Sequence, residues 1–257
     1  MRALPAAPET TAAPGAPPAR FRVALEYALE GDLRFLAHRD ELRMLMRALV
    51  RARWPIAYSQ GFNPLPRLSL PLPRNLGTAA ERQLALVDLR AARTPDELAA
   101  SLARTLPAGC VLQRVISPAP RVTPHALRVT YEIELRPEEA AVLGERGAAL
   151  TARSTLPIER ECGPGKPRRA IDIRPYIDRL ELEGCRLRLE LRFVQQRTAR
   201  PSEILTELGL AESCGQRLRR RAVQWDIELP GPSVGPALHE RKPLDQEDDC
   251  EEDRTRT

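Results

Sequence analysis

The chain has 257 residues, 42% of them hydrophobic, and its 40 Lys and Arg side chains outnumber its 35 Asp and Glu side chains. This length suits one large domain or two small ones, and no apolar run approaches the ~18 residues of a membrane span. The first residues lack the apolar stretch of a secretory signal, and the five cysteines have no regular spacing. We therefore expect a cytoplasmic protein with reduced thiols and no membrane partner.

The two ends of the chain differ from its middle. Residues 1–19 are rich in Ala, Pro and Thr, and residues 231–257 pass from Pro and Gly into an acidic cluster, so we expect disorder at both ends. Residues 240–257 hold eight acidic and four basic side chains, a net charge of −4, which leaves +9 on residues 1–239. This balance favours an acidic partner, although 38 of the 40 basic residues are Arg, a bias that GC-rich coding alone can produce.

Residues 20–120 predict a first folded unit. Apolar and polar residues alternate over 21–29, which predicts a strand, and Leu42, Leu45, Met46 and Leu49 share one face of a helix that ends before Pro55. A turn over 57–70 leads into a short extended segment. A strand at 82–89, a helix at 95–105 and a strand at 110–117 follow, and Thr94 and Glu97 form a capping box for that helix.

Residues 121–230 repeat this order. We expect a strand at 127–135, a helix from 137 to about 150, and extended segments at 168–177 and 185–194. A helix at 201–209 and a strand at 219–229 complete the unit. Two successive β-α-β-β-α-β units predict an α+β fold of two tandem ferredoxin-like domains.

Two groups of arginines are candidate phosphate contacts. Arg39, Arg43, Arg47 and Arg51 follow one stripe of the first long helix, opposite its apolar face. This stripe either contacts phosphates or is a solvated face on which Asp40 and Glu41 supply local pairing, and the solvated reading is favoured. A second run, Arg217 and residues 219–221 beside Gly215, is expected in a loop before the last strand, with phosphate contact and solvation equally weighted.

Three further features are candidate sites. His38 begins the first long helix and is either a general acid or base or, as we favour, a local hydrogen-bonding group. The turn "AYSQGFNPLPRLSL" contains Gly61, Pro64 and Pro66 and predicts a rigid binding loop; the alternative is a structural crossover whose Phe62 packs in the core. Asp172 and Arg174 are expected on one strand face, either as a binding pair or as an exposed ion pair.

Four stretches together resemble a known family: "GDLRFLAHRDELRMLMRAL", "YSQGFNPLPRLS", "IDIRPYI" and "RPSEILTELGL". They are similar to the radical-SAM-linked family of bacterial proteins, which carry a domain of unknown function, and the resemblance covers about residues 21–229. It implies a radical SAM protein as partner, whose cofactors would be S-adenosylmethionine and an iron–sulfur cluster. This chain has no cysteine motif for a cluster, so we expect it to bind no cofactor or metal itself. Leu65 stands where the family pattern usually has His, which argues against acid–base chemistry in the turn.

The leading hypothesis is an RNA-binding or substrate-delivery accessory protein that acts with a radical SAM enzyme and is not itself an enzyme. One alternative is a metal-independent endoribonuclease that uses His38, by distant fold analogy with RAMP-type endoribonucleases; another is a structural assembly factor. The candidate binding residues are Arg34, His38, Arg43, Arg47, Ser59, Gln60, Phe62, Asn63, Arg67, Asp172, Arg174, Arg219 and Arg220.

Overall fold

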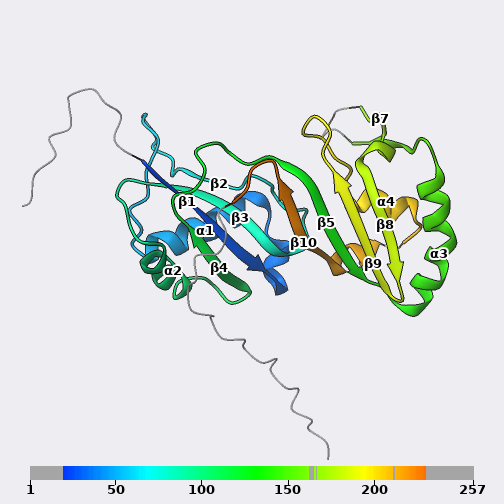
Figure 1. Ribbon diagram of the computed structural model, residues 1–257, viewed down its shortest axis with the longest axis horizontal. Helices are drawn as coiled ribbons and strands as arrows, with labels where there is room; N and C mark the ends of the chain where they lie inside the picture. Colours follow the sequence, from blue (N-terminus) through cyan, green and yellow to red (C-terminus); the bar gives the residue numbers. More distant parts are fainter. Residues whose placement is uncertain (1–19, 162–164, 166, 211, 230–257) are drawn as a thin grey trace, which may run out of the picture.

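The computed structural model describes residues 20–161, 165, 167–210 and 212–229, so the expectations of disorder at the two ends fall outside the described residues. The fold is mixed α+β, as expected, and is built on one long sheet that is mostly antiparallel (Figure 1). We call residues 20–120 the first half and residues 121–229 the second half. Among the described residues, no helix is long and apolar enough to cross a membrane.

The first half follows the predicted order. The capping box of its second helix is present, with the Glu97 N–H donating to Thr94 Oγ1 at 3.3 Å and the Thr94 N–H donating to the Glu97 carboxylate at 3.2 Å. The strand after the turn is reduced to two residues. The elements are β1 (Phe21–Leu29), the 3₁₀ helix η1 (Gly31–Phe35), α1 (His38–Arg51), β2 (Leu68–Ser69), β3 (Ala79–Leu89), α2 (Pro95–Ala103) and β4 (Cys110–Ile116).

The second half contains one strand that the sequence analysis placed wrongly. The extended segment expected at 168–177 stops at Asp172, a 3₁₀ turn begins at Arg174, and the strand that joins the main sheet runs from Ile177 to Glu183. The elements are β5 (Ala126–Glu134), α3 (Pro137–Ala152), β6 (Pro157–Arg160), β7 (Arg169–Asp172), η2 (Arg174–Tyr176), β8 (Ile177–Glu183), β9 (Arg186–Arg192), α4 (Pro201–Glu207), η3 (Glu212–Arg217) and β10 (Leu218–Trp225).

The strand order of the main sheet is β4-β1-β3-β10-β5-β9-β8, with β2 paired to β3 and the hairpin β6-β7 forming a separate small sheet. The two halves join where β3 and β10 run parallel, and only two residue pairs link these strands, Arg219 with Ala79 and Arg220 with Ala80. We call this junction the seam. An ion pair between Arg221 and Glu81 also crosses it.

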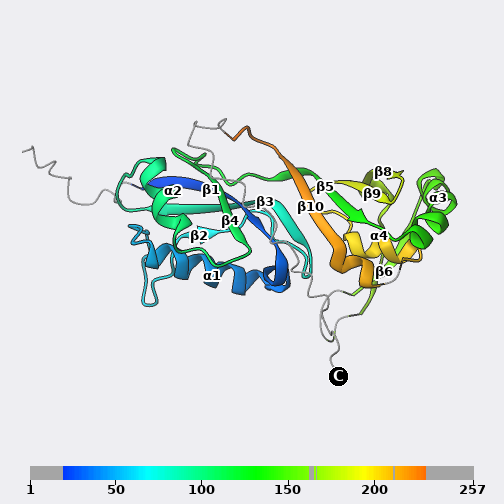
Figure 2. The same cartoon turned by 90° about the horizontal axis from the view of Figure 1, so that it is seen from below.

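Each half has its own hydrophobic cluster between the sheet and its helices. In the first half, Leu45 and Leu49 of α1 and Leu102 of α2 pack on β1 and β3; in the second half, Leu143 of α3 and Ile204 of α4 pack on β5 and β9. The helices therefore cover one face of the sheet, as Figure 2 shows for α1. We call the opposite side the open face.

A smaller cluster lies on the open face of the first half. Trp225 at the end of β10 and Leu229 pack against Ala24, Leu84 and Leu86. The C-terminal part of the described chain thus covers the open face of β1 and β3, which would otherwise contact solvent. This explains why the residues on both faces of β1 and β3 are largely buried.

Beneath α1 lies a buried ion pair that no local sequence pattern predicts. Glu41, predicted on the solvated side of the helix, faces the core, and its carboxylate accepts hydrogen bonds from Arg74 Nε at 3.1 Å and Tyr27 Oη at 2.7 Å. The Glu41 and Arg74 side chains are each 1% exposed. Burial, and then the neighbouring Glu41 carboxylate, raises the pKa of Tyr27 well above its ordinary value, so the phenol stays protonated and donates.

The remaining nitrogens of Arg74 bind the backbone around η1. They donate to the carbonyl oxygens of Arg34 at 3.1 Å and Thr78 at 2.5 Å, with longer contacts to Leu33 at 3.4 Å and Leu36 at 3.5 Å. One guanidinium thus fixes the turn after β1, the start of α1 and the start of β3. Buried carbonyls in a turn need such donors, because no helix or strand satisfies them.

Removing one member of this pair leaves the other charge buried without its counterion. We expect Glu41→Gln or Arg74→Met to lower the free energy of unfolding by about 3–5 kcal/mol in a urea titration. The double variant Glu41→Leu/Arg74→Met should recover only part of that loss, because the carbonyls that Arg74 binds and the Tyr27 hydroxyl stay without partners. Asp40→Asn, which breaks only the exposed pair with Arg43, is the control and should cost less than about 1 kcal/mol. Equal, small losses at Glu41 and Asp40 would contradict this assignment.

Candidate functional site

A hollow lined by several of the predicted residues lies at the seam, at the edge of the open face where β10 begins. It has a volume of about 720 Å³, and we call it the seam cleft. Four arginines and two glutamates dominate its wall, so its lining carries more positive than negative charge. The lining residues are Arg34, Ala79, Glu132, Glu134, Leu135, Arg136, Gln216, Arg217, Leu218 and Arg219.

Arg34 reaches the seam cleft from η1. Its backbone is fixed on two sides, because its carbonyl oxygen accepts from Arg74 at 3.1 Å and from the Gly77 N–H at 2.9 Å. Its guanidinium lies over the Phe35 ring, 4.8 Å from the centroid. Within the part of the chain that the structure describes, this guanidinium has no hydrogen-bond or ion-pair partner, and its Nε is buried without one. Arg34 is therefore a positioned cation whose charge no described carboxylate neutralises.

Arg219 enters the same cleft from β10, so the structure brings together two predicted binding residues from opposite ends of the chain. It pairs with Glu30 across the seam at 3.2 Å, and both side chains are substantially exposed. An exposed pair of this kind contributes little to stability. Arg219 can thus exchange Glu30 for another anion at low cost.

Arg217 and Arg136 of the cleft are held by Glu139. Arg217 Nη2 lies 2.7 Å from each Glu139 carboxylate oxygen, and the Arg136 N–H donates to the same carboxylate at 2.8 Å. The hydrogen bond from Arg217, followed by that backbone N–H, lowers the pKa of Glu139 to about 2. These contacts give the cleft a fixed wall.

The buried cysteines of the described chain are not activated nucleophiles. Burial is the main cause that raises the pKa of Cys214, which contacts Glu139 and Arg217, and burial raises the pKa of Cys110 to about 12. Both thiols stay protonated near neutral pH, and a thiol is a weak nucleophile in that form. Among the described residues, no group of three His, Cys, Asp or Glu side chains is arranged to hold a metal ion.

Arg220 is a correction to the sequence analysis. It was a candidate phosphate contact in a basic run expected just before the last strand, with solvation as the alternative, but it lies within β10, where alternation turns Arg220 to the helix side while Arg219 faces the cleft. Arg220 is 2% exposed, and its Nη1 donates to the Leu72 carbonyl at 3.2 Å. Burial lowers its pKa from the ordinary value. It cannot contact an external ligand and instead belongs to the interior of the seam.

The candidates on α1 lie outside the seam cleft. Arg43 and Arg47 are exposed on the side of α1 that faces away from the sheet, and Arg43 pairs with Asp40 at 3.0 Å as expected. His38 is exposed at the first residue of α1 and has no hydrogen-bond or ion-pair partner among the described residues. No neighbouring group therefore orients its imidazole for acid–base chemistry.

The turn over residues 57–70 is a closed loop at the end of the molecule away from the second half (Figure 1). Ser59 closes it: its N–H donates to the Leu65 carbonyl at 2.7 Å, and its hydroxyl accepts from the Leu65 N–H at 2.9 Å. Phe62 is fully exposed at the tip, so the alternative in which it packs in the core is wrong. The side chains of Gln60 and Asn63 are exposed and that of Arg67 is half-buried.

Asp172 and Arg174 are engaged in the fold and do not share a strand face. The Asp172 carboxylate accepts from the N–H groups of Leu156 at 2.7 Å and Arg174 at 3.0 Å. The Arg174 guanidinium donates to the carbonyls of Thr151 and Arg153, each at 2.9 Å, at the end of α3. Carbonyls at the end of a helix have no N–H partner within the helix, and Arg174 donates the missing hydrogen bonds.

Sequence reasoning missed Arg136 and Arg74. Arg136 precedes Pro137 and two glutamates, a pattern that indicated only a helix start. Arg74 follows a proline-rich stretch and meets Glu41, 33 positions earlier in the chain. No local spacing signals a pair of that separation.

Comparison with known proteins gives one family. Residues 22–202 match the family described as "Uncharacterized protein conserved in bacteria (DUF2344)", and no curated protein matches the chain. The expected bacterial domain of unknown function is thereby confirmed, whereas the association with radical SAM proteins stays a prediction. The match includes Arg34 and Arg136 but ends before β10.

The lowered pKa of Glu139 makes a pH-dependent contribution to stability. Its unfolded pKa is near 4.3, so the stabilisation is fully present above that pH and is lost as the pH falls toward 2. We expect the difference in free energy of unfolding between wild type and Glu139→Gln to shrink from pH 5 to pH 2 in urea titrations. The neighbouring Glu138→Gln, whose side chain is exposed, is the control. A difference that does not change with pH would contradict the assignment.

Proposed function

We propose that this chain, which belongs to the family described as uncharacterized proteins conserved in bacteria, binds single-stranded RNA in the cytoplasm through the seam cleft. One observation carries the proposal: the positioned guanidinium of Arg34, without a carboxylate partner among the described residues, lies in one cleft with Arg219. Guanidinium groups stay charged and bind phosphate through two parallel hydrogen bonds. The net charge of +9 on residues 1–239 supports an anionic ligand of some length.

The fold supports this choice of ligand. We interpret the two halves as tandem ferredoxin-like domains. When the β6-β7 hairpin, which forms a separate small sheet, is left out and the other strands of each half are numbered from its own first strand, β4-β1-β3-β2 and β10-β5-β9-β8 are the same order. An open sheet face is a surface on which single-stranded RNA is commonly bound. The seam cleft lies at the edge of such a face, and double-stranded RNA, being stiffer, would follow it less closely.

We further propose that the chain delivers RNA to a radical SAM enzyme and that the partner performs the chemistry with its S-adenosylmethionine and iron–sulfur cluster. The partner's identity rests on the resemblance of the motifs. The exposed apolar side chains of Tyr58, Phe62 and Leu65 on the closed loop support a protein contact. Co-purification of a radical SAM protein from native cells with wild type, and its absence with Phe62→Ser, tests this; retention with that variant removes the loop from the contact.

The RNA proposal predicts a specific weakening of electrostatic binding. For single-stranded RNA, Arg34→Ala/Arg219→Ala should reduce the slope of log K against log salt by about 0.7 for each phosphate that the variant no longer binds. Fluorescence anisotropy with a labelled oligoribonucleotide over a range of salt concentrations measures this slope. Arg104→Ala, an exposed arginine at the end of α2, is the control and should leave the slope near the wild-type value.

A different result identifies a different surface. If Arg43→Ala/Arg47→Ala lowers the slope and the cleft variant does not, RNA binds on α1 and the seam cleft is the wrong site. If the wild-type chain shows no salt-dependent binding of single-stranded RNA, the proposed function is wrong.

A further inference from the structure

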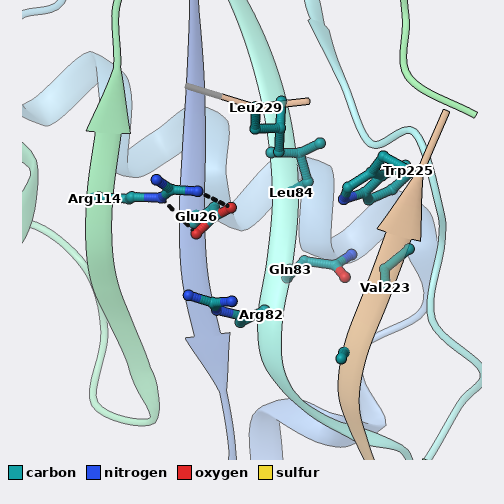
Figure 3. A pocket seen from close by; sticks show the side chains of 9 residues that line it. Glu26, Arg82, Gln83, Leu84, Arg114, Val223, Trp225 and Leu229 are labelled. Atoms are coloured by element: carbon teal, nitrogen blue, oxygen red, sulfur yellow. Dashed lines mark hydrogen bonds and ion pairs between the residues drawn. The ribbon is translucent and has the colours of Figure 1, made fainter. Parts of the chain in front are cut away.

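A second, smaller hollow lies on the open face at the other end of β10 (Figure 3). Beyond their two paired residues at the seam, β3 and β10 diverge, and the hollow lies between them. Its volume is about 180 Å³. This is smaller than the ~300–1,000 Å³ of pockets for drug-sized ligands, so it suits one planar ring system.

The walls of this hollow present flat groups. Trp225 forms one side, half-buried and packed near Leu84 and Leu229. Arg114 lies on the other side, where its Nε and Nη2 each donate to a Glu26 carboxylate oxygen at 2.7 Å, so its guanidinium plane is fixed. An indole ring and a fixed guanidinium are the two kinds of surface on which unpaired bases stack.

Polar groups at the floor and rim complement a base. Gln83 lies on the floor, is 1% exposed, and donates to the Leu72 carbonyl at 3.5 Å, while its Oε1 is buried without a partner among the described residues. A buried amide oxygen without a donor is costly, and a ligand N–H would satisfy it after a small rotation of the side chain. Arg82 at the rim is exposed, and the described residues offer it no hydrogen bond or ion pair.

The hollow and the seam cleft are connected by one strand. Arg219 and Arg221 point to the open face near the seam, and Trp225 lies six residues after Arg219 on β10. At ~3.3 Å per residue this separation is about 20 Å.

We infer that this hollow holds one unpaired base of a single-stranded RNA, stacked on Trp225, while the phosphates of the same strand follow β10 to the seam cleft. The inference rests on the proposed function and specifies it further, because it makes an unpaired base a requirement for full affinity. Phosphate contacts set the register of the strand, and the stacked base adds an interaction that salt does not screen.

Substitution of Trp225 in the full chain tests the inference. For a short single-stranded oligoribonucleotide, Trp225→Leu should weaken binding on the order of tenfold, with the salt slope unchanged. Trp225→Phe keeps an aromatic ring and should retain most of the affinity. An oligoribonucleotide of the same length as a fully paired duplex should bind wild type and Trp225→Leu equally.

Tryptophan fluorescence supplies a second readout, because it reports the surroundings of Trp225 in the bound complex. The chain has two tryptophans, and Trp54 is buried and donates to Ser101 Oγ at 3.0 Å. Single-stranded RNA should therefore quench the emission of Trp225 alone, and the quenching should vanish in Trp225→Leu.

The outcomes separate this inference from the proposed function. Unchanged affinity and unchanged quenching in Trp225→Leu, while Arg34→Ala/Arg219→Ala still lowers the salt slope, would overturn the base-binding hollow and leave the seam cleft in place. Quenching by a small apolar peptide but not by RNA would assign the hollow to a protein partner and also overturn the inference. Absence of any RNA binding by wild type would contradict both this inference and the proposed function.

Discussion

The buried ion pair between Glu41 and Arg74 is the interaction on which the surface of the first half depends. It takes two charges out of water, which is favourable only when every remaining donor and acceptor is satisfied. Here the remaining donors of Arg74 are used on the carbonyls around η1 and at Thr78. The turn that presents Arg34 is thus fixed from inside the core. A surface cation that would otherwise sample many positions is held where it faces the cleft.

At the seam, a buried arginine joins the two halves. Strand alternation along β10 sends Arg219 to the open face and Arg220 inward, where it shares the Leu72 carbonyl with Gln83. Arg220 belongs to the second half, and Leu72, whose carbonyl it binds, belongs to the first. Such contacts are directional, so they hold the two halves in one relative position, whereas a purely apolar interface would let them slide. The open-face residues of β10 therefore stand in a fixed relation to η1.

The sequence predicted those elements whose signals are local. The apolar face of α1, the capping box of α2 and the alternation of β5 and β9 each depend on neighbours within a few positions, and each is found close to its expected bounds. The prediction was wrong where contacts between residues far apart in the sequence determine the local structure. The segment at 168–177 looked extended, but Asp172 binds the N–H of Leu156 and Arg174 binds the end of α3, which divides it. Glu41 and Arg220 are charged residues in the core, and only partners far along the chain, Arg74 and Leu72, explain them. The sequence analysis named Arg34 and Arg219 of the candidate site. It could not predict that they line the same cleft, because this depends on how β3 and β10 pair at the seam.

The central claim is that single-stranded RNA lies on the open face along β10. Cross-linking of RNA to the intact chain tests this claim most directly. An oligoribonucleotide containing 4-thiouridine at each position in turn would be irradiated with the full-length protein, and the cross-linked peptides would be identified by mass spectrometry. We expect cross-links in residues 218–225 and in η1, moving along β10 as the modified position moves along the RNA. Cross-links confined to the exposed side of α1 or to the loop around Phe62 would contradict the account.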